Sequence, residues 1–290
     1  AKEAILTFVR EVTDPASSAF VEPQARVATF DNDGTLWAEK PIYFQIAFIF
    51  RGILEQSDDH PQWSSQMPFQ AVLENDLEAL KKLTNEDVLT LAFASYPEMT
   101  QSEFNVIADE WLGAVKHPRF GVLYKELIYA PMVELLDYLR ANDFRPFIVS
   151  GGGIEFIRAF SREAYDIPPE QVIGSSLKYE FVETETGSEL MRRAEVGSIN
   201  DKDMKPVNIQ LHVGRRPILA FGNSDGDIEM LRYTNDGDGS RLSLLLHHDD
   251  AEREYDYDHG TERALELAET EGWTVVSIKK DFGTVFSAVH

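Results

Sequence analysis

The 290-residue chain contains no cysteine. This absence excludes disulfides, thiolate nucleophiles and cysteine-ligated metals. It leaves the redox compartment open, because a protein without cysteine folds in either environment. Basic residues are also few, since 27 Lys and Arg stand against 50 Asp and Glu and give a formal charge of −23. Such a charge disfavours nucleic acids and anionic membranes as partners, because both are bound through cationic surfaces.

Long hydrophobic runs are missing as well. The nearest approach to one, Tyr43 to Leu54, contains Gln45 and Arg51 and is too short to cross a bilayer, so we expect no membrane insertion. What the chain does contain is typical of a globular protein, with 43% hydrophobic and 27% charged residues. Its length allows one or two domains with a full core.

The hydrophobic pattern changes along the chain. A short apolar strand is expected at residues 26–31, and residues 42–118 then repeat apolar positions at helical spacing without a strand pattern. From about residue 126 onwards, helix and strand patterns alternate, which predicts a parallel sheet covered by helices on both faces. We therefore predict an α/β protein with a core of residues 1–41 and 119–290 and an all-helical domain of residues 42–118 inserted after the first strand.

The same spacing predicts the individual elements. In the inserted region, Thr100 and Glu103 form a capping box at the start of a helix. Residues 177–197 alternate around a Thr186-Gly187 turn and predict a β-hairpin. In the core we expect a helix that begins at Pro131, strands at residues 145–149, 171–176, 217–221, 241–247 and 273–278, and further helices at residues 3–12, 154–165, 206–212, 226–233 and 261–271.

Two carboxylates follow the first predicted strand. Asp31 and Asp33 come directly after the apolar run Val27 to Phe30, and Gly34 then lets the chain turn away. Ligands bind at the carboxyl ends of strands in an open parallel sheet. Two neighbouring acids repel each other unless a cation or a shared proton compensates. The pair therefore indicates metal-assisted chemistry in which one carboxylate can attack.

Three further polar groups stand at or near predicted strand ends. Ser150-Gly151-Gly152-Gly153 opens a helix, where free amides and the helix dipole attract anions. Lys205 starts the helix before another strand and can balance negative charge. The loop Phe221-Gly-Asn-Ser-Asp-Gly-Asp227 supplies hard oxygen ligands suited to Mg²⁺. Each is weak evidence alone, because such segments are commonly simple turns or solvated side chains.

A run of four polar residues, His247-His248-Asp249-Asp250, offers another possible metal site. Adjacent residues on a strand point to opposite faces of the sheet, so these side chains are not expected to share one ion.

The order and placement of the four strand-end groups resemble the haloacid dehalogenase superfamily of phosphotransferases. Asp-Asn-Asp-Gly-Thr-Leu-Trp from Asp31, the Ser-Gly-Gly at Ser150 and the Gly-Asn-Ser-Asp-Gly-Asp loop from Gly222 look most similar to its phosphoserine phosphatase-like branch. A group of bacterial haloacid dehalogenase-like hydrolases is similar over nearly the whole chain. The resemblance implies a Rossmann-like core, and the helical insertion resembles the superfamily's C1-type cap.

The resemblance implies a role for each carboxylate. Asp31 would be the nucleophile that forms an aspartyl-phosphate, and Asp33 would act as general acid and then general base. Lys205 would balance the charge, with Lys202 as the alternative. Mg²⁺ would be the cofactor, and its ligands would be Asp31, the backbone carbonyl of Asp33, Asn223 and, directly or through water, Asp227.

The resemblance also implies how the substrate is held. Ser150 and the Gly151 amide would hold the phosphoryl group, together with Asn32 and Gly152. The cap would close over the leaving group near the two crossings between core and cap, which makes the following residues candidates for specificity: Glu39, Tyr43, His117 and Arg119. Arg119 could pair with an anionic substrate.

One position departs from the family pattern. The residue after Gly222 is usually an acidic metal ligand, and here it is Asn223. An amide oxygen can still bind Mg²⁺, but one negative charge is lost.

The expected activity is hydrolysis of a small-molecule phosphomonoester, because Asp33 can protonate a leaving alkoxide. A phosphomutase or phosphotransferase uses the same pair of acids, and a phospho-ligand-binding protein weakened at Asn223 is the non-enzymatic alternative. The sequence identifies neither the alcohol released nor the oligomeric state. We expect a periplasmic protein with its leader removed, since the similar bacterial hydrolases often carry one, and the cytoplasm is the alternative.

Overall fold

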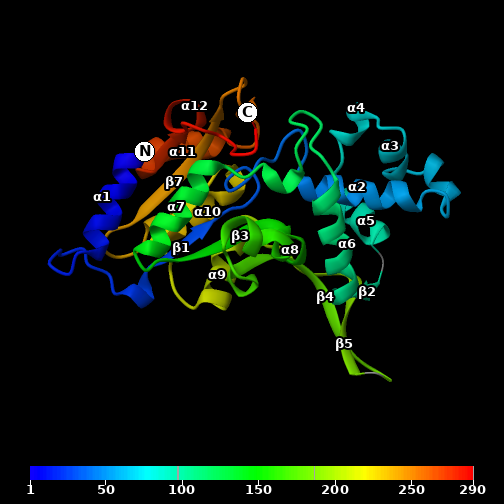
Figure 1. The fold of residues 1–290 in the computed structure, drawn as a ribbon, viewed down its shortest axis with the longest axis horizontal. Coiled ribbons are helices and arrows are strands. Elements are labelled where there is room, and N and C mark those ends of the chain that lie inside the picture. The colour runs from blue at the N-terminus through cyan, green and yellow to red at the C-terminus, as the bar shows by residue number, and fades with distance from the viewer. Residues whose placement is uncertain (97, 186, 290) are drawn as a thin grey trace. The chain divides into compact units, whose positions relative to one another are not determined.

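The computed structural model describes residues 1–96, 98–185 and 187–289 (Figure 1). The chain forms two compact units. The first, here called the core unit, comprises Ala1–Lys40, Ala114–Ser175 and Ile199–His290, and the second, the insert unit, comprises Pro41–Gly113 and Ser176–Ser198. No helix among the described residues is long and apolar enough to span a bilayer.

A largely parallel sheet forms the centre of the core unit. The strand β1 lies between β3 and β6, β4 pairs with the other edge of β3, and β7 and β9 continue the sheet beyond β6, all in parallel. The short strand β8 pairs with β7 in the antiparallel direction. The strand bounds are β1 Val27–Phe30, β3 Arg145–Gly153, β4 Val172–Thr184, β6 Leu219–Gly222, β7 Leu242–Asp249, β8 Asp256–Tyr257 and β9 Thr274–Ser277.

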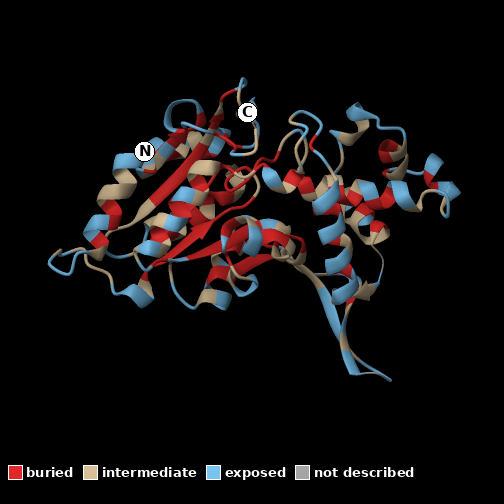
Figure 2. Ribbon diagram, in the orientation of Figure 1, coloured by how far each residue is buried: buried red, intermediate tan, exposed pale blue. Residues whose placement is uncertain are grey.

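Helices pack on this sheet through their apolar faces. The helices α7, α8 and α9 contact β3, while α10 contacts β6 and β7, and Figure 2 shows the sheet as the most buried part of the core unit. The helix bounds are α1 Lys2–Thr13, α7 Ala130–Ala141, α8 Ile154–Tyr165, α9 Met204–Val213, α10 Ile228–Asn235, α11 Glu262–Glu271 and α12 Ile278–Asp281, with short 3₁₀ turns at Pro23–Ala25, Tyr124–Glu126, Pro169–Gln171 and Asp225–Asp227.

The position of β1 in the sheet determines where the site forms. All four residues of β1 are buried, as expected for a strand covered on both faces. Because β1 has a parallel partner on each side, the residues that follow it lie beside those that follow β3 and β6. The carboxyl end of β1 is therefore a place where side chains from three connections can meet.

The insert unit is helical with a small antiparallel sheet. The predicted capping box is present, since Glu103 accepts hydrogen bonds from the backbone N–H and the hydroxyl of Thr100, and the Thr100 hydroxyl accepts one from the N–H of Glu103. The bounds are α2 Phe44–Gln56, α3 Phe69–Leu73, α4 Leu77–Leu80, α5 Asn85–Ser95, β2 Met99–Thr100, α6 Gln101–Ala114 and β5 Gly187–Ser198, with a 3₁₀ turn at Pro61–Ser65.

The structure differs from the sequence-based expectation in three details of this unit. The region 42–118 is not purely helical, because β2 pairs with β5. The hairpin of β4 and β5 groups with the helices, although the predicted boundaries leave it in the core. The apolar residues that repeat at helical spacing over 69–80 lie in two helices, α3 and α4, and not in one. The chain turns between them because Asn75 adopts φ 50° and Asp76 caps the second helix. Thr186 of the predicted turn lies outside the described residues.

Candidate active site

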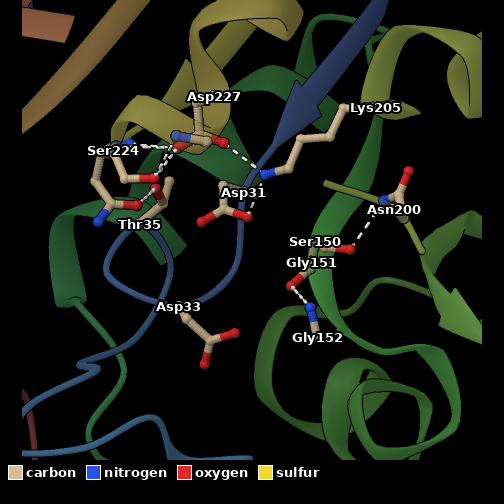
Figure 3. Close-up of polar contacts among 12 residues, drawn as sticks. Asp31, Asp33, Thr35, Ser150, Gly151, Gly152, Asn200, Lys205, Ser224 and Asp227 are labelled. Atoms are coloured by element: carbon tan, nitrogen blue, oxygen red, sulfur yellow. Dashed lines mark hydrogen bonds and ion pairs between the residues drawn. The ribbon is translucent and has the colours of Figure 1, made fainter. Parts of the chain in front are cut away.

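A lysine and two aspartates form a buried ionic group at the end of β1. Lys205 Nζ lies 2.8 Å from Asp31 Oδ1 and 2.5 Å from Asp227 Oδ1 (Figure 3). Asp31 directly follows β1, Lys205 lies in the first turn of α9, and Asp227 ends the 3₁₀ turn after β6. All three side chains are at least nine-tenths buried. Three segments that are distant in sequence thus meet where the sheet topology brings them together.

The charges of this group are not balanced. Burial raises the pKa of Asp31 well above its usual value, Asp227 raises it further, and Lys205 opposes both effects. Burial lowers the pKa of Lys205, but the two carboxylates outweigh this and raise it above its ordinary value. Lys205 is therefore a permanent cation shared by two buried acids.

Asp33 is held apart from this group by a tryptophan. Its Oδ1 accepts a 2.8 Å hydrogen bond from Trp37 Nε1, and the Trp37 ring is buried against Phe160 with the ring centres 4.2 Å apart. Burial raises the pKa of Asp33 to about 6, the bond from Trp37 lowers it, and the charge of Glu39 raises it. A carboxyl with this pKa can both give and take a proton near neutral pH.

We expect Trp37→Phe to move the titration profile of the Asp33 carboxyl to higher pH. The phenyl ring retains the stacking on Phe160 but donates no hydrogen bond, so the pKa of Asp33 rises further above its usual value. The pKa of Asp33, followed by NMR titration of its side-chain carboxyl carbon, is expected to rise by about one unit. Trp273→Phe, in the hydrophobic core, is the matched control. An unchanged profile in Trp37→Phe would contradict the assigned role of the hydrogen bond.

Ser150 begins the Gly-rich loop of residues 150–153, which is the irregular end of β3 and suits an anion. The Ser150 hydroxyl is buried and accepts a 3.0 Å hydrogen bond from the Gly152 N–H (Figure 3). Gly151 is exposed, and a Cβ there would meet no atom closer than 3.8 Å. The segment leads directly into α8, whose first amides have no partner within the helix. The predicted phosphate-binding residues on this loop are thus placed at an accessible helix start.

Asn200 is a supporting residue that the sequence did not reveal. Its Nδ2 donates to the Ser150 carbonyl at 2.9 Å, and its Oδ1 accepts from Asn208 Nδ2 at 2.9 Å. Asn200 is completely buried. A single asparagine after a hairpin carries no local signal, because its role depends on contact with a segment 50 residues away. It fixes the backbone of this Gly-rich loop.

Two predicted binding residues also take part in local hydrogen bonds. The Asn32 carbonyl accepts hydrogen bonds from the N–H groups of Thr35, Leu36 and Trp37, so this residue closes the turn after β1. Arg119 donates to the carbonyls of Ala251 and Glu252 at 2.8 and 3.2 Å. The arginine contacts fix the chain near its second crossing.

The other specificity candidates of the core unit also contact its own residues. Glu39 Oε1 accepts a 2.7 Å hydrogen bond from the Tyr257 hydroxyl. His117 Nδ1 accepts from the Arg119 N–H, so its Nε2 carries the proton and donates to the Lys40 carbonyl at 2.7 Å. Tyr43 belongs to the insert unit and is exposed.

The amide of Asn223 faces three oxygen atoms. With its nitrogen turned toward them, Asn223 donates to the Asp33 carbonyl at 3.0 Å, to Asp31 Oδ2 at 3.2 Å and to Thr35 Oγ1 at 2.9 Å. Lys205 occupies the other oxygen of Asp31, so Oδ2 remains directed at Asn223. The oxygens of Asp31 and Asp33 that the sequence predicts as metal ligands therefore converge on one point.

The donor set at this point fits Mg²⁺. A carboxylate oxygen and a backbone carbonyl are hard ligands, and Asn223 presents its own oxygen when its amide turns over. Asp227 is less available, because its Oδ2 accepts from the N–H groups of Asn223 and Ser224, both at 3.0 Å. No cluster of three or more acidic or histidine side chains suited to a metal occurs among the described residues. A metal here would rely on a carbonyl and an amide beside the single carboxylate of Asp31.

Comparisons with known proteins agree with this fold. A family model described as haloacid dehalogenase-like hydrolase matches residues 28–232. No curated protein matches the chain. A solved structure of a conserved, functionally unknown protein from Anaerococcus prevotii DSM 20548 has 16% identity and a TM-score of 0.55, covering 95% of this chain and 91% of that one. A protein of unknown function from Bordetella pertussis Tohama I has 17% identity and a TM-score of 0.53, covering 87% and 97%.

Fold and site together define an α/β protein with its polar residues at the carboxyl ends of parallel strands. The match of the family model over more than half of the sequence identifies it further: the chain belongs to the haloacid dehalogenase-like hydrolases.

Proposed function

We propose that this protein is a Mg²⁺-dependent phosphatase that hydrolyses a small-molecule phosphomonoester through an aspartyl-phosphate on Asp31. The observation that carries the proposal is the pair of acids after β1. Asp31 contacts a buried lysine, and Asp33 has a pKa of about 6 in the same turn. One acid is thus suited to attack and the other to proton transfer.

The proposed reaction proceeds in two displacements. An Asp31 oxygen attacks phosphorus, the ester P–O bond breaks, and Asp33 gives its proton to the departing alkoxide. Asp33 then takes a proton from water, whose oxygen attacks the phosphorus of the aspartyl-phosphate and releases inorganic phosphate and Asp31. During both steps the Ser150 hydroxyl and the Gly151 and Gly152 amides bind the phosphoryl oxygens.

Lys205 and the metal would each neutralise part of the negative charge of Asp31 and the phosphoryl group. Lys205 holds one oxygen of Asp31 and orients the carboxylate, as its two short contacts support. Mg²⁺ would be bound by Asp31, the Asp33 carbonyl, Asn223 and, through water, Asp227. When bound, it would supply electrostatic stabilisation to the transferring phosphoryl group. With Asn223 in place of an acid, we expect that metal to be held weakly.

Phosphate release from p-nitrophenyl phosphate tests the proposal. The wild-type protein is expected to release phosphate with Mg²⁺, to lose at least about nine-tenths of this activity in excess EDTA, and to recover it when Mg²⁺ is restored. Release at background with Mg²⁺ would contradict the proposal and favour a phospho-ligand-binding protein. EDTA-resistant activity would contradict the metal requirement. A panel of phosphomonoesters compared by kcat/KM would then identify the leaving alcohol.

The Asn223→Asp variant is the comparison for metal binding. It returns a carboxylate to the point where the oxygens of Asp31 and Asp33 converge, so half-maximal activity is expected at a lower Mg²⁺ concentration than in the wild type. An unchanged or higher requirement would show that residue 223 does not contact the metal.

A further inference from the structure

A buried histidine contacts the turn that carries the catalytic acids. His248 lies in β7, and its Nε2 is 2.8 Å from the carbonyl oxygen of Gly34. Its Nδ1 is 3.1 Å from Glu254 Oε2. His248 is 1% exposed and Glu254 is completely buried. The neighbouring His247 points the other way and contacts Asp258 at 2.8 Å, as the alternation of a strand requires.

The two partners of His248 define its hydrogen bonding. The Gly34 carbonyl can only accept, so Nε2 carries a proton and donates to it, while Nδ1 shares a hydrogen bond with the Glu254 carboxyl group. The Tyr129 hydroxyl donates to the other oxygen of Glu254 at 3.3 Å, and the Tyr257 ring stacks on His248 with the ring centres 4.5 Å apart. The His248–Glu254 pair is therefore enclosed, and Nε2 of the ring is left for Gly34.

Gly34 is the point at which the catalytic turn is most constrained. Its φ is 75°, a conformation that favours glycine. A Cβ at this position would lie 2.8 Å from Asn223 Cγ and 2.9 Å from Glu39 Cδ, so the turn packs tightly against the site. Gly34 joins two peptide groups: one carries the Asp33 carbonyl that faces Asn223, and the other carries the carbonyl that His248 holds.

We propose that His248, held by its hydrogen bond with Glu254, is a positioning residue of the phosphatase reaction. By fixing the Gly34 carbonyl it fixes the left-handed turn, and thereby the direction of the Asp33 carbonyl and carboxyl in the site. His248 touches neither substrate nor metal in this role. The inference rests on the proposed function, although its structural part can be measured without activity.

The test uses two amide variants of similar polarity. In His248→Gln the side-chain nitrogen can occupy the place of Nε2 and donate to Gly34, whereas in His248→Asn the shorter side chain retains only the contact with Glu254. We expect His248→Asn to lower kcat for p-nitrophenyl phosphate by about ten- to a hundredfold with KM changed less than about threefold. His248→Gln is expected to recover most of the lost kcat. His247→Asn, on the opposite face of β7, is the matched control.

Hydrogen exchange of residues 31–37 provides the second measurement. Loss of the bond to Gly34 is expected to speed amide exchange in this segment in His248→Asn but not in His247→Asn. The inference is overturned if the Asn and Gln variants have equal kcat, if only KM changes, or if exchange in the segment stays as in the wild type. An inactive wild type contradicts the proposed function instead, and the exchange measurement then still decides whether His248 fixes the turn.

Discussion

Replacing Asp31 by Asn is expected to lower phosphate release from p-nitrophenyl phosphate by at least about a thousandfold. The amide that replaces the carboxylate has no anionic oxygen to attack phosphorus, so no aspartyl-phosphate can form. The fold is expected to persist, because Lys205 remains paired with Asp227 at 2.5 Å. Burial raises the pKa of Asp31, which means that its ionised form is costly in the folded protein. Replacing this carboxyl with a neutral amide removes that cost. The predicted result is loss of kcat with thermal stability unchanged or higher.

The control for this variant is Asp166→Asn. Asp166 is exposed at the end of α8 and has φ 52°, a conformation that asparagine adopts readily. Both variants make the same chemical change, and only one lies in the site. Activity of Asp31→Asn above about a tenth of the wild-type value would refute covalent catalysis at this residue, and an equal loss in Asp166→Asn would show that the effect is not specific.

Local patterns predicted much of the core. The predicted helix at residues 154–165 has the bounds of α8, and the predicted strands overlap β1, β3, β4, β6, β7 and β9. These elements have strong apolar periodicity and packing partners on a large sheet, so local propensity and tertiary structure agree. The strand-end rule also predicts that Asp31, Lys205 and Asp227 lie near one another, and in the structure they are in contact.

The sequence could not distinguish contacts that depend on exact side-chain placement. Lys202 and Lys205 are three residues apart, but Lys202 is exposed with φ 52° before α9 begins, whereas Lys205 lies inside the first turn. The bond from Trp37 to Asp33 and the bond from His248 to Gly34 likewise leave no local pattern. The β4–β5 hairpin joins the insert unit in part by pairing with β2, a two-residue strand that is too short to produce a periodic signal.

The second large effect is expected for Lys205→Met, which removes the ammonium and preserves the length of the side chain. Asp31 and Asp227 would then face each other in a buried site without a cation. Breaking a buried ion pair on one side costs about 3–5 kcal/mol of unfolding free energy. We therefore expect a destabilised protein with no measurable phosphatase activity. Urea unfolding and phosphate release from p-nitrophenyl phosphate measure the two effects.

The pH dependence of this loss gives a sharper test. The pKa of Asp31 is already raised in the folded protein, and without Lys205 it rises further, so folding favours the protonated acid. A carboxyl whose pKa is higher in the folded state than in the unfolded state does not oppose folding at low pH. It lowers the free energy of unfolding as the pH rises from its unfolded-state pKa of about 4 through its folded-state pKa. Lys205→Met is therefore expected to be closer to the wild type in stability at pH 5 than at pH 8.

Two comparisons separate this effect from a general loss of packing. Lys202→Met removes an exposed ammonium three residues earlier and is expected to leave both stability and activity near the wild type. Adding Asp227→Asn to Lys205→Met removes one of the two opposed carboxylates and is expected to recover part of the stability at pH 8 without recovering activity. A Lys205→Met protein as stable as the wild type at pH 8 would show that the buried acids are not held by Lys205. A loss of stability in Lys205→Met that is equal at both pH values would assign the lysine a packing role. A loss caused by the missing positive charge would instead increase as Asp31 ionises.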